Sequence, residues 1–254
     1  MHGGGFTSGG LDQRESDAPA RELAAHGRRV RTVDYRLAPS MGLSMFWRDP
    51  DLRPTATRFP AALHDVEDAA SDLAASSKAP IHLGGASAGA NLAAATAVAF
   101  RDRQPERIRC LALAYGIYHA QLPDAPEIEN ELRGALVKWA FGPAMVRRMN
   151  LNYVGAPDRL APGLAFPGGT DLHALPPALV LDARNDRLRR SGHAFASELR
   201  AAGVSVQETV VEGQHAFLNT PKSNSFRIGV EHLAAWLRAH DIAESDATSP
   251  GART

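Results

Sequence analysis

The chain has 254 residues, a length that suits one α/β domain, and 44% of them are hydrophobic, enough for a substantial core. Its 28 basic and 28 acidic side chains give a formal net charge of zero, so we expect a neutral or apolar small molecule rather than nucleic acid or an anionic membrane as its partner. No uninterrupted apolar run of about 18 residues occurs, and residues 1–6 do not resemble a signal peptide. We therefore predict a cytoplasmic protein.

Strand and helix patterns alternate along the chain. A helical pattern around 18–26 precedes an alternating, strand-like stretch at 29–35, and a proline-rich excursion then leads to a helix over about 61–76. The later strands are expected at 81–85, 108–115, 178–182 and 204–211, and the later helices at 88–100, 195–202 and 229–240. This alternation predicts an α/β fold with a mostly parallel sheet and helices on both faces.

Residues 117–170 interrupt the alternation. A helical pattern at 129–141 places Leu132, Leu136 and Trp139 on one face, and a loop rich in proline and glycine follows. Such an insertion indicates a cap over the site, whose apolar stripe serves either packing or, less favoured, ligand contact. We predict one catalytic domain at 1–240 and, from its polar composition, a disordered tail at 241–254.

The sharpest chemical signal is the sequence Gly-Ala-Ser-Ala-Gly at 85–89. It lies between an expected strand and an expected helix, where a nucleophilic serine needs a strained turn that presents its hydroxyl above the sheet edge. Both glycines are required there because side chains would clash in so tight a turn. We predict Ser87 as a nucleophile, against the alternative of a glycine-rich turn without a chemical role.

A serine hydroxyl is a weak nucleophile that needs a base within hydrogen-bond reach. His215 is the best placed of the ten histidines, because it follows the strand at 204–211, where the chain order serine, aspartate, histidine puts the base. The other histidines considered lie in or next to predicted helices and strands and are more simply surface or packing residues: His26, His64, His173, His193, His232 and His240.

Two aspartates are candidates for the acid that orients this base. Asp182 ends the strand at 178–182, whereas Asp186 lies in the following loop and has the freedom to reach an imidazole. We favour Asp186, with Asp182 as the alternative.

The sequence His-Gly-Gly-Gly-Phe at 2–6 precedes the serine. Ester cleavage passes through a tetrahedral oxyanion that backbone N–H groups stabilise, and loss of one such donor typically costs about 2.7–4 kcal/mol. A glycine run lets the backbone approach the substrate carbonyl without side chains in the way. A His-Gly-Gly-Gly loop ahead of a nucleophile turn is an arrangement of lipases and esterases, so we predict an oxyanion hole.

Together these motifs resemble the bacterial hormone-sensitive-lipase-like esterases. The matching segments run in the expected order at 2–6, 34–39, 59–63 with Asp65, 85–93, 175–178, Asp186 with 188–189, and 215–217. The resemblance implies an α/β-hydrolase fold with a cap, oxyanion donors at Gly4, Gly5 and Ala88, and hydrolysis of short-acyl carboxylic esters without a cofactor or metal. It also supports Asp186 as the acid, and it leaves a homodimer through the last strand and helix as an expectation.

Three features depart from the family pattern. Ala86 replaces the aspartate that usually precedes the serine, and Arg187 replaces a proline that usually follows the acid, which slightly weakens that assignment. The segment at 40–58 is longer than usual and either covers an acyl pocket or forms a surface loop with its own apolar anchor. Its large apolar side chains are Met41, Met45, Phe46 and Trp47.

The family also carries several dozen residues ahead of the glycine loop, including a strand that runs into it. Without that strand, the strands expected at 29–35 and 81–85 lose the neighbour between them, and backbone groups stay unpaired. We therefore expect either a truncated reading of a longer protein or a sheet that closes differently, and we favour the first.

The sequence thus predicts a serine carboxylesterase. Ser87 attacks the ester carbonyl, His215 carries the proton to the leaving alcohol, and Asp186 holds the imidazole tautomer. The alternatives are a non-catalytic relative that binds a small ligand, an amide or formamide hydrolase, and an N-terminally truncated, inactive esterase. Formamidase-like relatives carry an aromatic residue where Gly5 stands, which weighs against the amide reading.

Overall fold

The computed structural model describes residues 1–77 and 80–241. The helices are α1 Arg14–Ala25, α2 Ala61–Ser76, α3 Ala88–Arg101, α4 Pro126–Glu131, α5 Ala135–Trp139, α6 Pro143–Val154, α7 Arg189–Ala201 and α8 Asn224–Asp241. The strands are β1 Ile81–Ala86, β2 Ile108–Ala114, β3 Ala178–Asn185 and β4 Val206–Gln214. Beyond Asp241, the tail predicted at 241–254 lies outside the described residues.

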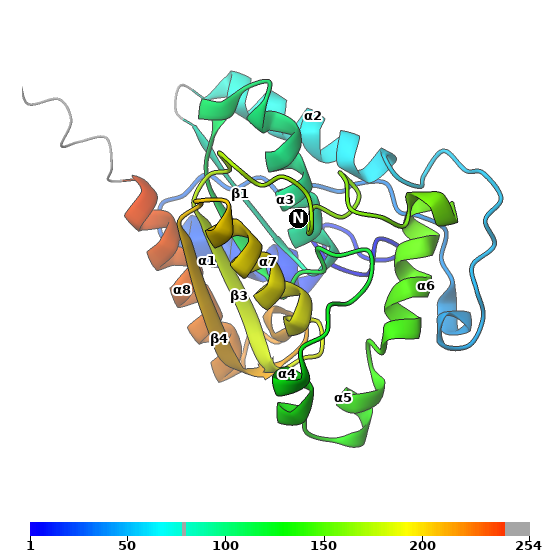
Figure 1. The fold of residues 1–254 in the computed structure, drawn as a ribbon. Helices are drawn as coiled ribbons and strands as arrows, with labels where there is room; N and C mark the ends of the chain where they lie inside the picture. Colours follow the sequence, from blue (N-terminus) through cyan, green and yellow to red (C-terminus); the bar gives the residue numbers. More distant parts are fainter. Residues whose placement is uncertain (78–79, 242–254) are drawn as a thin grey trace, which may run out of the picture.

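The four strands are parallel and lie in the order β1-β2-β3-β4 (Figure 1). Helices α2, α3 and α7 pack on one face of the sheet, and α8, with α1 beside it, packs on the other. This confirms the predicted parallel sheet covered on both faces. Because all strands run the same way, their carboxyl ends meet at one edge, where ligand sites of such sheets form.

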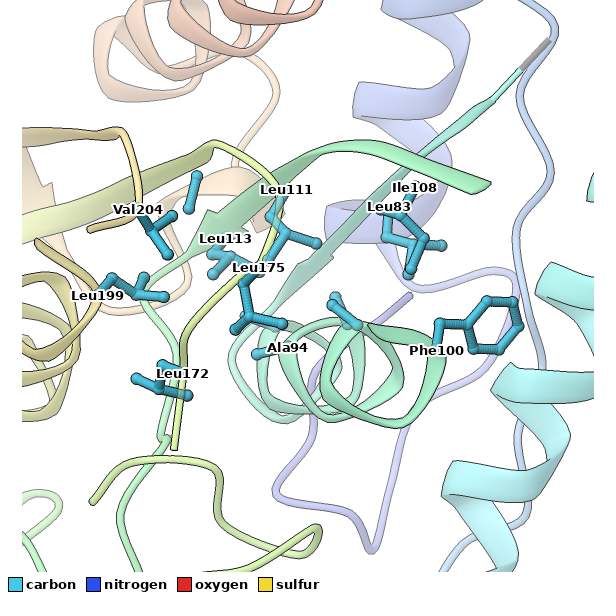
Figure 2. Close-up of a cluster of buried hydrophobic side chains, with 14 of the residues drawn as sticks. Leu83, Ala94, Phe100, Ile108, Leu111, Leu113, Leu172, Leu175, Leu199 and Val204 are labelled. Atoms are coloured by element: carbon cyan, nitrogen blue, oxygen red, sulfur yellow. The ribbon is translucent and has the colours of Figure 1, made fainter. Parts of the chain in front are cut away.

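Apolar layers on the two faces hold the strands in place. Figure 2 shows the layer under α3 and α7, in which Leu111 and Leu113 of β2 belong to the same apolar cluster as Ala94 of α3 and Leu199 of α7. Helix α3 is buried over most of its length, because its run of alanines lets it pass close to the strands. The opposite layer joins the sheet to α8, where the Trp236 indole N–H donates to the Leu111 carbonyl at 2.9 Å.

Residues 29–35 form no strand, which corrects the sequence prediction. β1 is one of the two edge strands, and a cavity of about 540 Å³ lies beside it, lined by Val30, Val33, Leu73 and Leu83 among others. The alternating side chains are present at 29–35, but among the described residues their backbone groups form no backbone hydrogen bonds to a neighbouring strand.

Met1 occupies one end of this gap. Its amino group donates to the Gly84 carbonyl at 2.8 Å, and the Ala86 N–H donates to the Met1 carbonyl at 3.1 Å. These two bonds are the pattern of one residue in a parallel strand beside β1. Burial lowers the pKa of the Met1 amino group to about 6, opposed by the nearby Glu15 carboxylate. Whether a further strand completes the sheet ahead of Met1 stays a prediction.

The cap segment also differs from the single helix predicted at 129–141. It forms α4 and α5 with a break at Gly134, whose φ of +88° ends any continuous helix. Leu132 is buried, whereas Leu136 is 81% exposed, so the expected apolar face does not exist. Helix α6 was missed, although its proline at N1 and Gly155 in the left-handed conformation after its end are ordinary helix boundaries.

The long segment at 40–58 packs against this cap. The rings of Phe46 and Trp139 lie 4.5 Å apart, and Arg148 of α6 donates to the Phe46 carbonyl at 3.1 Å. Its covering of an acyl pocket, and the domain and cap boundaries at 1–240 and 117–170, stay predictions. Among the helices of the described residues, none is long and apolar enough to cross a bilayer.

Candidate active site

Ser87 lies on the sharp turn between β1 and α3. Its φ of +54° and ψ of −118° are a strained combination for a residue with a side chain. A Cβ on Gly85 would lie 2.2 Å from the Gly89 carbonyl oxygen, and a Cβ on Gly89 would lie 2.4 Å from the His2 carbonyl oxygen. Only glycine fits at either position, as the motif predicted.

His215 follows β4 directly, and its imidazole lies between Ser87 and Asp186. Nε2 is 3.2 Å from Ser87 Oγ, and Nδ1 is 2.6 Å from Asp186 Oδ2. A carboxylate accepts only, so this contact assigns the proton to Nδ1 and leaves Nε2 as the acceptor. The other oxygen of Asp186 accepts the Leu188 N–H at 2.9 Å, which fixes the carboxylate. The structure thus brings together the three residues selected from the sequence.

The environment of His215 suits a base that exchanges a proton with Ser87. Burial lowers the pKa of the imidazole, but the charge of Asp186 and its hydrogen bond outweigh burial, so the net pKa is raised above 6.5. Asp186 is itself buried, at 1% exposure.

Asp182, the alternative acid, lies within β3 rather than at its end. It is fully buried beside Gly192 of α7, and among the described residues neither of its carboxylate oxygens has a hydrogen-bond partner. Burial, reinforced by Asp186 and Glu208, raises its pKa well above the ordinary value. The carboxylate bonded to His215 Nδ1 is that of Asp186, not that of Asp182.

The glycine loop at 2–6 lies against the serine turn. A Cβ on Gly3 would lie 3.0 Å from Ser87 Cβ, which places this backbone directly beside the serine. Gly4 and Gly5 have φ of +101° and +59°, conformations that glycine adopts at little cost. Within residues 1–77 and 80–241, the N–H groups of Gly4, Gly5 and Ala88 donate to no protein acceptor.

The start of this loop is held from behind by a buried aromatic pair. The His2 imidazole stacks on Tyr35 with ring centroids 4.2 Å apart, and the Tyr35 hydroxyl donates to the His2 carbonyl at 2.8 Å. Tyr35 comes from the segment at 34–39 that carries part of the family resemblance, so the contact gives that motif a structural role.

Two buried residues beside the site were not predicted. The Tyr115 ring meets the His215 imidazole edge-on at 5.0 Å, and its hydroxyl donates to Glu15 at 2.9 Å. Glu15 also accepts the Gly3 N–H at 2.8 Å. In the sequence Glu15 is an acidic residue in the first turn of a helix, a common pattern, so no signal distinguishes it.

The segment predicted as a cap contacts His215. Phe141, which follows α5, packs on the imidazole with ring centroids 4.6 Å apart. Arg187 links the loop of Asp186 to the cap, because its Nε donates to Glu129 at 3.0 Å and its Nη1 donates to the Ala140 carbonyl at 3.3 Å. The position where the family carries proline is therefore a cap contact here.

Across the described part of the chain, no cluster of three His, Cys, Asp or Glu side chains could hold a metal ion.

Comparisons with known proteins agree with this architecture. Residues 52–219 match the family model of the alpha/beta hydrolase fold. Carboxylesterase NlhH of Mycobacterium tuberculosis is 32% identical over 222 residues, which cover 81% of this chain and 61% of that protein, so the chain spans about three fifths of that relative's length.

Solved structures extend the likeness. An esterase of Pyrobaculum calidifontis matches with a TM-score of 0.79 at 30% identity, covering 95% of this chain and 75% of that one. A hormone-sensitive lipase from a metagenome library matches with a TM-score of 0.75 at 25% identity, covering 94% and 76%. The chain belongs to the α/β-hydrolase fold family, among its hormone-sensitive-lipase-like members.

Proposed function

We propose that this chain is a serine carboxylesterase in which Ser87 is the nucleophile, His215 the general base and Asp186 the residue that orients the base. The observation that carries the proposal is the hydrogen-bonded series from Asp186 through His215 to Ser87, at the carboxyl ends of β3, β4 and β1. The names of the relatives, carboxylesterase and esterase, support the same reaction class.

The first half of the reaction acylates the enzyme. Ser87 Oγ attacks the ester carbonyl carbon while His215 Nε2 takes the hydroxyl proton. The resulting imidazolium is stabilised by Asp186, which keeps the other ring proton on Nδ1. When the tetrahedral intermediate collapses, the C–O bond to the alcohol breaks, and His215 returns the proton to the leaving oxygen.

The second half releases the acid. Water attacks the acyl-enzyme carbonyl carbon as His215 takes a proton from it, and collapse returns that proton to Ser87 Oγ as the carboxylic acid leaves. The N–H groups of Gly4, Gly5 and Ala88 stabilise the negative oxygen in both tetrahedral intermediates. Their support is the positive φ of both glycines, the nearness of the loop to Ser87 and the absence of protein acceptors for these groups among the described residues.

The substrates we propose are small, neutral, short-acyl esters. The zero formal net charge gives no overall attraction for an ionic ligand, and Phe141 packs on the base, which limits the room above it. A homodimer and a cytoplasmic location stay predictions from the sequence.

Labelling with an alkyl fluorophosphonate tests the nucleophile directly. The serine oxygen displaces fluoride from phosphorus, so we expect one adduct per chain on the tryptic peptide that contains Ser87, and none in Ser87→Ala. Ser205→Ala, which removes a serine outside the site, should label like the wild type. An adduct at another serine, or no adduct in a folded sample, would refute the assignment.

A further inference from the structure

We propose that Glu15 is a positioning residue for the reaction, whose single buried carboxylate fixes both the oxyanion loop and the residue packed against the base. This inference rests on the proposed function of Ser87 and His215. Glu15 acts through Gly3 and Tyr115 rather than on substrate.

Three donors converge on the two oxygens of Glu15. Oε1 accepts the Gly3 N–H at 2.8 Å and the Gln13 side-chain amide, and Oε2 accepts the Tyr115 hydroxyl at 2.9 Å. Glu15 is only 5% exposed, so water does not replace these partners freely. A carboxylate has enough lone pairs to accept all three bonds, whereas a side-chain amide has one acceptor oxygen.

On one side, this carboxylate sets the position of the glycine loop. A Cβ on Gly3 would lie 2.4 Å from Glu15 Oε1 and 3.0 Å from Ser87 Cβ, so the Gly3 backbone is held between the carboxylate and the serine. A run of glycines has more conformational freedom than any other sequence and does not hold donors in place by itself. The bond to Gly3 supplies that restraint immediately before Gly4 and Gly5.

On the other side, Glu15 fixes the surroundings of the base. It holds the hydroxyl of Tyr115, whose ring meets both the His215 imidazole at 5.0 Å and the Phe217 ring at 5.1 Å. The Glu15 backbone N–H also donates to Asn219 Oδ1 at 2.9 Å, in the turn that follows His215. The start of α1 is therefore bonded to the oxyanion loop and to the base loop at once.

The charge of Glu15 reaches the base as well. After burial, which lowers the pKa of His215, and Asp186, which raises it, the Glu15 carboxylate contributes a further raising effect. The titratable groups that face Glu15 are the Met1 amino group, His2, Tyr35, Tyr115 and His215. A variant that keeps the shape of Glu15 but removes its charge separates positioning from electrostatics.

The test compares Glu15→Ala with Glu15→Gln on p-nitrophenyl butyrate. Glu15→Ala should lower kcat by about 10- to 100-fold with little change in KM, because displaced donors weaken transition-state stabilisation more than substrate binding. Glu15→Gln can still accept from Gly3 and donate to the Tyr115 oxygen, so most of kcat should return. Its acid limb in the pH profile of kcat/KM should move to lower pH, because a negative charge near His215 is gone.

Asp17→Ala is the matched control. Asp17 lies on the same helix as Glu15, but its carboxylate pairs with Arg21 at the surface. Its kcat, KM and pH profile should match those of the wild type. A trifluoromethyl ketone, which adds to Ser87 as a tetrahedral oxyanion, should lose affinity in Glu15→Ala by the same factor as kcat/KM. Amide hydrogen exchange of residues 1–6 should be faster in Glu15→Ala than in Glu15→Gln.

Wild-type kcat and pH profile in Glu15→Ala would overturn the inference. Equal losses in both variants with an unmoved pH profile would also overturn it, because they indicate only a stability role. A wild-type chain without Ser87-dependent turnover would instead refute the proposed function. The exchange measurement would then still judge the inference, since unchanged exchange at 1–6 in Glu15→Ala would contradict it.

Discussion

The ring of Phe141 packs on the imidazole of His215, with the two ring centroids 4.6 Å apart. Phe141 follows α5, in the segment predicted as a cap, and His215 follows β4, so that segment contacts the proposed base itself. The pKa of His215 therefore depends on opposing influences. Burial lowers it, whereas Asp186 and, to a smaller extent, Glu15 raise it.

The first prediction concerns the pH dependence of activity. The base must be neutral, so kcat/KM should fall on acidification with a midpoint above 6.5, because the net pKa of His215 is raised. Asp186→Asn removes the group that raises it, so the midpoint should move down, and kcat should fall on the order of 10⁴-fold through loss of the correct tautomer. Rate profiles from pH 5 to 9 measure both effects. An unmoved midpoint in Asp186→Asn would contradict the role of Asp186.

The second prediction concerns the cap. Phe141→Ala admits water to the imidazole and relieves the burial that lowers its pKa, so the acid limb of kcat/KM should move to higher pH. Trp139→Ala is the matched control, because Trp139 is a cap aromatic that is 57% exposed and contacts Phe46. Equal shifts in the two variants would show that Phe141 has no particular effect on the base.

The third prediction concerns Asp182, whose pKa is raised mainly by burial. The folded chain keeps a proton there that the unfolded chain releases above about pH 4, so stability is lost as pH rises from that value toward the folded-state pKa. Asp182→Asn carries no such proton. Its unfolding free energy relative to the wild type should rise with pH above about pH 4, by at most about 1.4 kcal/mol per pH unit, until the pH reaches the folded-state pKa of Asp182. Urea unfolding measures this, with Asp17→Asn as an exposed control; parallel pH curves would contradict it.

The fourth prediction concerns the open edge of β1. An apolar, strand-forming extension ahead of Met1 should raise the melting temperature, because it continues the pairing of Met1 into the neighbouring cavity and turns a buried amino group into an amide. The second residue before Met1 should donate to the His82 carbonyl, while the first should point away from β1. Proline at the second position should therefore remove most of the gain, whereas proline at the first should remove less. Equal effects at both positions would contradict the parallel register.

Much of the sheet and of the site follows from the sequence, because both depend on local patterns. Apolar runs and turn residues predict the strands that precede Ser87 and Asp186, and chain order together with its place after a predicted strand selects His215. The sequence could not show that residues 29–35 form no strand, because an alternating pattern becomes a strand only where a neighbouring strand supplies backbone hydrogen bonds. It also could not show the role of Glu15, because the contacts of Glu15 with Gly3 and Tyr115 join segments far apart in the sequence.

Hydrolysis of p-nitrophenyl butyrate by the purified 254-residue chain, with Ser87→Ala measured beside it, tests directly whether Ser87 is the nucleophile of an esterase. We expect turnover by the wild type and its loss in the variant, with both samples equally folded by circular dichroism. Wild-type turnover retained in Ser87→Ala would contradict the assignment of the nucleophile. A folded wild type with no turnover of any short-acyl ester would contradict the proposed esterase activity of this chain.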